Sequence, residues 1–244
     1  MLNQNIDTIF FDVGATLRYV VEDREFAAEA ERQLMELVGA TEPHNVFFEK
    51  LEKNWKAYRK LAKTRLLDVS EMELWLQYLL PDYPAEIVAP HAAKLTRLWR
   101  DHDGRRVAHE GTPETLRELK KRGYKLGIIA NTITETEIPD WMCEAKVADC
   151  FHTVILSSKV RLRKPDPAID LLAARCADAL PENCAYVGDN PVRDVEGALD
   201  AGFGAMILFE DAGTADREGK TPTRKPTATI QSIPELLNYF PDRG

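Results

Sequence analysis

Strand-like and helix-like segments alternate along the second half of the chain, and this alternation restricts the fold more than any other feature of the sequence. Strands that alternate with helices pair in parallel, because each helix carries the chain back along one face of the sheet. The sequence therefore predicts an α/β fold with a doubly wound, Rossmann-like parallel sheet. The predicted strands are residues 125–130, 153–156, 185–187 and 205–208, and the helices that precede them are residues 113–121, 138–148, 167–177 and 193–201.

An apolar run near the start, residues 6–11, supplies one more strand and ends in a turn at residues 12–16. The next segment, residues 22–103, contains no convincing strand and shows helical spacing throughout. Three of the four tryptophans lie in it, which indicates an apolar core of its own. We therefore predict a Rossmann-like core domain of residues 1–19 and 104–244 and an inserted all-helical domain of residues 20–103.

Four stretches of the insert have helical spacing, and local signals mark the limits of two of them. Gly39 is placed to end the first stretch, and Ser70, with Glu73 three residues later, is placed to begin the third. Near the end of the chain, the polar residues 211–226 predict an exposed loop before a last short strand and a helix at 234–239. The four stretches run from Phe26 to Leu37, from Phe47 to Tyr58, from Met72 to Leu80 and from Pro84 to Trp99.

The chain carries a formal net charge of −8, and its cysteines and histidines do not have the spacing of a zinc site. Nucleic-acid-binding domains and membrane-surface proteins usually present a basic patch, so we expect neither nucleic acid nor a membrane as partner. No cationic segment followed by an apolar run opens the sequence, and the expected location is the cytoplasm. Nothing in the pattern favours a monomer over a dimer.

Charged and polar side chains directly follow the predicted strands, at the edge where open parallel sheets bind ligands. Three of them are aspartates, which repel one another unless a cation lies between them. Carboxylate oxygens suit Mg²⁺, which also binds the oxygens of a phosphorylated substrate. A lysine at the same edge can neutralise the oxygens of a transferring phosphoryl group. The residues concerned are Asp12, Asn131, Thr132, Lys164, Asp189 and Asp194.

Four short motifs, in this order, resemble those of the haloacid dehalogenase (HAD) superfamily of hydrolases. Residues 12–17, with the sequence DVGATL, resemble the first motif, and Asn131 lies where the second motif ends. Residues 164–165, with the sequence KP, resemble the third motif, and residues 188–194 resemble the fourth. The resemblance covers nearly the whole chain, because the helical insert lies where a C1-type cap of the family follows the first motif.

The resemblance implies a Mg²⁺-dependent phosphatase that acts on a small phosphorylated metabolite through an aspartyl-phosphate on Asp12. The cap is expected to close over the site and to select the substrate. By this resemblance the catalytic residues are Asp12 and Lys164, the substrate-binding residues are Gly14, Asn131, Thr132 and Lys164, and the metal ligands are Asp12, Gly14 through its backbone carbonyl, Asp189 and Asp194.

Two positions depart from the family pattern. Phosphatases of the family usually carry a second aspartate two residues after the nucleophile, as general acid, where this chain has Gly14. The second motif usually offers a hydroxyl to the phosphate, where this chain has Ala130. Three interpretations stay open: a substrate with a good leaving group, such as an acyl or aryl phosphate; an acid from elsewhere; or a catalytically weak protein that binds phosphorylated ligands. Dehalogenation is disfavoured because both Asp189 and Asp194 are present. The candidates for the acid are His102, Asp101 and Glu22.

Overall fold

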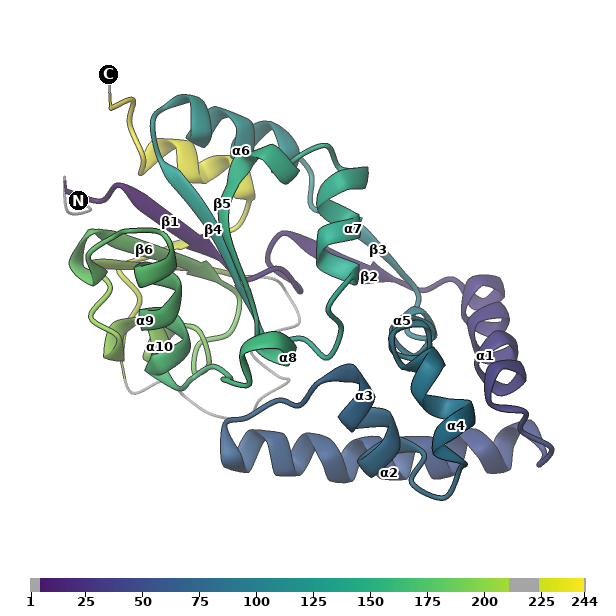
Figure 1. Cartoon of the computed structure of the whole chain (residues 1–244). Coiled ribbons are helices and arrows are strands. Elements are labelled where there is room, and N and C mark those ends of the chain that lie inside the picture. The colour runs from purple at the N-terminus through teal and green to yellow at the C-terminus, as the bar shows by residue number, and fades with distance from the viewer. Residues whose placement is uncertain (1–4, 211–223, 244) are drawn as a thin grey trace.

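Six parallel strands form the central sheet of the protein, in a computed structural model that describes residues 5–210 and 224–243. The strands are, in chain order, β1 (Thr8–Phe11), β4 (Lys125–Ala130), β5 (Phe151–Leu156), β6 (Cys184–Gly188), β7 (Ala205–Phe209) and β8 (Ala228–Ile230). Their order across the sheet is β5-β4-β1-β6-β7-β8, and all neighbours are parallel (Figure 1). The predicted fold class is confirmed, and the carboxyl ends of β4, β1 and β6 are neighbours.

Helices cover both faces of the sheet, because its strands are apolar on both sides. Ile9 and Phe11 of β1 belong to one buried cluster, whereas Phe10 between them belongs to another on the opposite face. Full burial of a side chain as large as phenylalanine contributes about 1.5–3 kcal/mol to stability. The first face is covered by α6 (Thr112–Lys121), α7 (Glu137–Glu144) and the 3-10 helix η5 (Ile233–Asn238), and the second by α9 (Pro167–Cys176) and α10 (Val195–Asp200). Shorter helical segments are η3 (Ala148–Cys150), α8 (Ser157–Val160) and η4 (Pro181–Asn183).

The helical insert packs around a separate apolar core that includes the buried Leu34, Leu51, Trp75 and Trp99. Its helices are α1 (Arg24–Val38), α2 (His44–Arg65), α3 (Glu71–Glu73), the π-helix η1 (Leu74–Leu79), α4 (Ala85–Val88), η2 (Ala89–His91) and α5 (Ala92–Asp101). Figure 1 shows them beside the sheet, with α2 extended along their outer side.

The local signals of the insert act as predicted. Gly39 ends α1 with a φ of 64°, a left-handed conformation that glycine adopts without steric cost. The Ser70 hydroxyl accepts a hydrogen bond from the backbone of Glu73 and caps the third stretch. That stretch continues as a π-helix, which helical spacing alone did not predict. The domain limits at residues 20 and 103 stay a prediction.

Two short strands that the sequence did not predict lie where the chain enters and leaves the insert. β2 (Arg18–Val21) and β3 (Arg105–Ala108) pair antiparallel to form a separate two-stranded sheet. Neither strand has a long apolar run, and each needs a partner from a distant part of the chain. The pairing fixes the two connections of the insert side by side.

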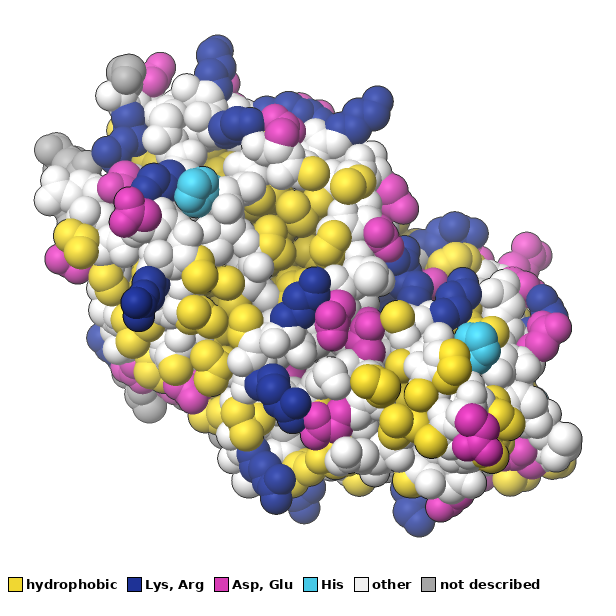
Figure 2. Space-filling model, viewed as in Figure 1, with side chains coloured by type: hydrophobic (Ala, Val, Ile, Leu, Met, Phe, Trp, Pro, Cys, Tyr) yellow, Lys and Arg dark blue, Asp and Glu magenta, His cyan; other side chains and the backbone are white. Residues whose placement is uncertain are grey.

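Small differences from the predictions lie at the ends of elements. The helix predicted at 138–148 ends at Glu144, the helix predicted at 193–201 begins at Val195, and the last predicted helix is a 3-10 helix. Most of the predicted loop 211–226 lies outside the described residues. Among the residues that are described, no helix combines the length and the apolar character that a membrane span requires. Figure 2 shows basic and acidic side chains interspersed over the face in view.

Candidate active site

Asp12 lies at the carboxyl end of β1, the strand between β4 and β6. Its backbone N–H donates a hydrogen bond to the Val187 carbonyl at 2.9 Å, which continues the pairing of β1 with β6 by one residue. The side chain is almost fully buried, yet the residue lines a cavity of about 200 Å³. Burial of a carboxylate is costly unless charges or hydrogen bonds compensate it, so the neighbours of Asp12 decide what it can do.

Lys164 lies beside Asp12 and is as fully buried as a residue of the apolar core. Its Nζ lies 3.1 Å from Asp12 Oδ1 and 2.8 Å from Asp194 Oδ1. It also donates a hydrogen bond to the Tyr186 hydroxyl, which in turn donates to the Ile129 carbonyl at 3.0 Å. Two carboxylates thus compensate the buried ammonium group and fix its position next to Asp12.

Asp189 and Asp194 come from the segment that follows β6. One oxygen from each of Asp12, Asp189 and Asp194 can be chosen so that all three lie within 4.8 Å of one another. The Thr16 hydroxyl donates to Asp189 Oδ1 at 3.3 Å, and the backbone N–H of Asn190 donates to Asp194 Oδ2 at 2.9 Å. The structure therefore brings together all four charged residues that the sequence singled out.

The two aspartates of this segment have opposite pKa shifts. Burial, with the nearby charges of Asp194 and Asp12, raises the pKa of Asp189 above its usual range. Burial alone would also raise the pKa of Asp194, but Arg193 and Lys164 outweigh it and lower that pKa. Three carboxylates thus face two adjacent cations, Lys164 and Arg193, which leaves part of the negative charge uncompensated.

Arg193 completes the cluster, and the sequence analysis did not identify it. Its Nη2 lies 2.9 Å from Asp12 Oδ2, 3.2 Å from Asp189 Oδ1 and 3.2 Å from Asp194 Oδ2. The sequence indicated the role of Arg193 only through its position directly before Asp194. Helical periodicity does not predict where a long side chain points.

The donor set of the cluster fits Mg²⁺, which prefers carboxylate oxygens and binds through a few of them. The Gly14 backbone lines the same cavity as Asp12. An ion bound to the same oxygens would compete with Arg193, because its guanidinium group contacts an oxygen of each of the three carboxylates.

Gly14 and Ala130 both line the cavity, as their places in the first two motifs suggested. A Cβ atom added to Gly14 would have no heavy atom within 4 Å, so there is open space at the start of a side chain at this position. Neither residue offers an acid or a hydroxyl. His102, Asp101 and Glu22, the candidates for a replacement acid, do not line this cavity.

Asn131 and Thr132 follow β4 and line the cavity, but other contacts already use part of their bonding capacity. The Asn131 side chain accepts a hydrogen bond from the backbone N–H of Lys164 at 2.9 Å and donates to the Lys164 carbonyl at 3.0 Å. One amide hydrogen of Asn131 is left for a ligand. The pairing makes Asn131 a positioning residue for Lys164.

The backbone of Thr132 is connected to the helical insert through one serine. Its N–H donates to the Ser157 hydroxyl at 2.9 Å, and that hydroxyl donates to Asp68 Oδ2 at 2.6 Å. Asp68 lies between α2 and α3, is fully buried, and also accepts from Tyr58 at 3.0 Å and from Arg163 at 2.8 Å. A residue of the insert thus helps to position the loop after β4.

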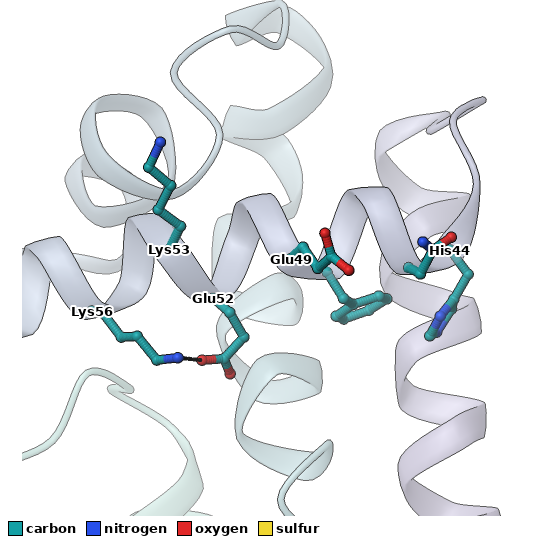
Figure 3. A pocket seen from close by; sticks show the side chains of 7 residues that line it. His44, Glu49, Glu52, Lys53 and Lys56 are labelled. Atoms are coloured by element: carbon teal, nitrogen blue, oxygen red, sulfur yellow. Dashed lines mark ion pairs between the residues drawn. The ribbon is translucent and has the colours of Figure 1, made fainter.

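A second hollow lies on the outer side of α2, and Figure 3 shows that its lining side chains all project from this one helix. Lys56 and Glu52 form an ion pair of 3.7 Å there, and the rings of His44 and Phe48 lie 4.6 Å apart. Such contacts at a spacing of four residues are ordinary on an exposed helix. We therefore place the candidate active site at Asp12.

Comparison with known proteins identifies the family of the chain. The family of haloacid dehalogenase-like hydrolases matches residues 6–202. A glyceraldehyde 3-phosphate phosphatase from Methanopyrus kandleri is 27% identical over 191 residues, which cover 70% of this chain and 80% of that protein.

Solved structures show the same fold. A 2-haloacid dehalogenase from Pseudomonas syringae pv. Tomato superposes with a TM-score of 0.69 at 21% identity and covers 96% of this chain and 97% of its own. The HAD hydrolase YfnB from Bacillus subtilis, solved with bound magnesium, superposes with a TM-score of 0.58 at 19% identity and covers 96% of this chain and 98% of its own. With the fold, the strand-end aspartates and the matched residues 6–202 taken together, this chain belongs to the haloacid dehalogenase-like hydrolases.

Proposed function

We propose that the chain is a phosphatase that transfers the phosphoryl group of a small phosphorylated metabolite to Asp12, with Mg²⁺ as cofactor. The observation that carries the proposal is the pair of cations on the Asp12 carboxylate, with Lys164 at 3.1 Å on one oxygen and Arg193 at 2.9 Å on the other. These two ion pairs compensate the charge of the buried carboxylate and fix its position as the nucleophile. Relatives with phosphatase activity support the reaction class.

In the proposed reaction, Asp12 attacks phosphorus and the ester oxygen departs, which leaves an aspartyl-phosphate that water then hydrolyses. Lys164 neutralises phosphoryl oxygens and stays fixed by Asp194 during the transfer. Asp12, Asp189, Asp194 and the Gly14 carbonyl would hold Mg²⁺, which supplies positive charge to the phosphoryl oxygens. Asn131 and Thr132 complete the proposed binding site.

Because Gly14 offers no proton to the leaving group, we propose that the preferred substrates have leaving groups that depart without protonation. Acyl and aryl phosphates meet this condition. The same feature favours a second candidate function, that of a protein which binds phosphorylated ligands and turns them over poorly.

The experiment that tests the proposal is hydrolysis of para-nitrophenyl phosphate and of acetyl phosphate, with Mg²⁺ or with EDTA. Asp12→Asn is expected to abolish turnover, because an amide is not a nucleophile towards phosphorus. Asp149→Asn is the matched control, since Asp149 is exposed and pairs with Lys120 away from the cavity. Full activity in a folded Asp12→Asn protein would exclude the mechanism. Binding of Mg²⁺ and phosphate without any turnover would instead establish the second function.

A further inference from the structure

Three arginines from separate parts of the chain line the cavity that contains Asp12. Arg18 lies on β2, Arg106 on β3 and Arg100 near the end of α5. Ala108 is the pairing partner of Arg18, two residues after Arg106, so Arg18 and Arg106 project from the same face of the two-stranded sheet. We call Arg18, Arg100 and Arg106 the arginine wall.

One buried carboxylate, that of Glu137 at the start of α7, receives all three guanidinium groups. Its oxygens lie 2.9 Å from Arg18 Nη2, 2.6 Å from Arg106 Nε and 3.3 Å from Arg100 Nε. Burial opposes the ionisation of Glu137, but the positive charges of the arginines outweigh it and hold its pKa at about 2. Figure 1 shows α7 beside β2, β3 and α5, at the junction of the insert with the sheet domain.

The arginine wall presents three positive charges to the cavity and shares one carboxylate there, that of Glu137. Arg193 does not belong to this set, because Asp12, Asp189 and Asp194 compensate it. Asp101 and Asp103 approach Arg106 no closer than 3.8 Å and 3.5 Å and do not line the cavity.

Arg106 pairs with three carboxylates, yet two of its guanidinium nitrogens lack a hydrogen-bond partner of good geometry. These are Nε and Nη2, within the described part of the chain, and the side chain is only 7% exposed. Burial, with the adjacent positive charge of Arg100, lowers the pKa of Arg106 to about 10. An anion that enters the cavity supplies an acceptor for the buried nitrogens of Arg106.

We propose that the arginine wall binds a carboxylate of the substrate, so that, among small phosphate monoesters with comparable leaving groups, those with a carboxylate at the far end are preferred. Guanidinium groups match the planar carboxylate with paired hydrogen bonds. A cavity of about 200 Å³ is smaller than ordinary ligand pockets of roughly 300–1,000 Å³, and a carboxylate fits it better than a second phosphate. The inference rests on the proposed function, because Asp12 attacks the phosphoryl group and the arginine wall binds the opposite end of the same substrate.

The test compares 3-phosphoglycerate with glycerol 3-phosphate, which has a hydroxymethyl group in place of the carboxylate. For the wild-type chain with Mg²⁺, kcat/KM is expected to be at least about tenfold higher for 3-phosphoglycerate, the change that one charge-assisted hydrogen bond produces. Arg100→Gln is expected to remove most of this preference, and Arg100→Lys to restore part of it. Arg100 is chosen because its side chain is 31% exposed, so its loss perturbs packing least.

Arg97→Gln is the matched control. Arg97 lies on the same helix, belongs to the same ion-pair network through Asp101 and Asp140, and does not line the cavity. If the ion-pair network had only a structural role, Arg100→Gln and Arg97→Gln would each lower kcat/KM equally for the two substrates. Equal kcat/KM values for the two substrates in the wild type, or an unchanged ratio in Arg100→Gln, would overturn the inference.

Calorimetry with the Asp12→Asn protein separates this inference from the proposed function, because it measures binding without turnover. The Asp12→Asn protein is expected to bind 3-phosphoglycerate at least about tenfold more tightly than glycerol 3-phosphate, and Asp12→Asn combined with Arg100→Gln to lose the difference. If the wild type hydrolyses neither of these esters, nor para-nitrophenyl phosphate or acetyl phosphate, the phosphatase proposal fails while this measurement still decides the role of the arginine wall. Equal affinities would contradict it.

Discussion

Three buried carboxylates share two cationic side chains, Lys164 and Arg193, at the centre of the site. Arg193 lies among all three carboxylates, where a metal ion could also be held. Arg193 contacts an oxygen of each of Asp12, Asp189 and Asp194. Lys164 forms ion pairs with Asp12 and Asp194 but, among the described residues, none with Asp189, which therefore depends mainly on Arg193 for compensation. A divalent ion that bound to the same oxygens would therefore have to displace the Arg193 guanidinium group.

This competition predicts that Arg193→Gln raises the affinity for Mg²⁺ by about tenfold or more, equivalent to about 1.4 kcal/mol. Titration calorimetry with MgCl₂ measures the Kd. In the absence of Mg²⁺ the variant should have a lower Tm than the wild type, and Mg²⁺ should raise that Tm by more than it raises the wild-type value. Arg175→Gln, on the exposed side of α9, controls for the loss of one positive charge. An unchanged Kd in Arg193→Gln would show that Arg193 does not compete.

Gly14 predicts a gain of function. Space around its Cβ position is open, and it lines the cavity two residues after Asp12. Gly14→Asp is therefore expected to fold and to supply the missing general acid, which accelerates hydrolysis of alkyl phosphates by up to about 10²-fold. The measurement is kcat for glycerol 3-phosphate relative to para-nitrophenyl phosphate, whose leaving group needs no proton. Gly14→Asn, which has the same size but no acid, should leave the ratio unchanged. An equal gain in both variants would refute an acid–base explanation.

At the scale of elements, α9 contributes a buried carboxyl group that the proposed reaction does not use. Asp170 is 1% exposed, and neither of its oxygens has a hydrogen-bond partner among the described residues. Burial raises its pKa to about 7, because the nearby charge of Lys164 only partly offsets desolvation and the charges of Asp194 and Asp166 act against ionisation. Gly197 of α10 leaves room for this side chain, since an added Cβ would lie 3.3 Å from Asp170 Oδ2.

The raised pKa predicts that Asp170 weakens the fold as pH rises. Between pH about 4 and pH about 7 the folded protein keeps a proton that the unfolded chain loses, so the free energy of unfolding falls across this window. Asp170→Asn removes the titration. We expect its free energy of unfolding, minus that of the wild type, to be about 2–3 kcal/mol higher at pH 8 than at pH 5, as measured by urea unfolding. Asp178→Asn at the end of the same helix is the control. A stability difference that does not vary with pH would contradict the assignment.

At the scale of the whole molecule, polar contacts fasten the insert to the sheet domain at several points. Asp68 and Arg163 form a buried pair at 2.8 Å, and Arg161 and Glu73 form an exposed pair at 2.7 Å. The Glu71 carboxylate accepts a hydrogen bond from the backbone N–H of Glu135 at 2.9 Å. Ile133, from the loop after β4, packs in the apolar core of the insert. The two parts therefore meet through both apolar and charged groups.

The buried contact is predicted to matter far more than the exposed one. Asp68→Asn removes the charge that compensates Arg163, and we expect it to lower the free energy of unfolding by about 2–3 kcal/mol. Glu73→Gln should cost less than about 1 kcal/mol, because solvent screens its pair with Arg161. Urea unfolding of both variants gives the comparison. Equal losses would mean that burial does not determine the strength of these contacts.

The sequence predicted the features that depend on neighbouring residues. The apolar run before Asp12 and the turn after it indicated a buried strand that ends at the site, and the parallel sheet then placed Asp189 at the adjacent strand end. Gly39 and Ser70 were identifiable because caps act over a few residues. These positions follow from local chemistry and from the topology of α/β folds.

The missed features depend on residues that are distant in sequence. β2 and β3 pair across the whole insert, and neither has a distinctive pattern of its own. The arginine wall is formed by residues of β2, β3 and the end of α5, so the pattern within any one of these segments does not predict it. Arg193 was overlooked because its role depends on the direction of a long side chain. Asn131 follows β4 and lines the cavity, but its pairing with the Lys164 backbone could not be predicted from spacing.

The connection from Asp68 through Ser157 to Thr132 has a consequence for how such proteins diversify. A cap acquired from another member of the family would bring its own residue to the place of Asp68, and the Ser157 hydroxyl would lose the acceptor that fixes it. The loop after β4 would then change shape although no residue in it had been substituted. In chimeras of this chain, we therefore expect Asp68 and Ser157 to work best when both come from the same parent.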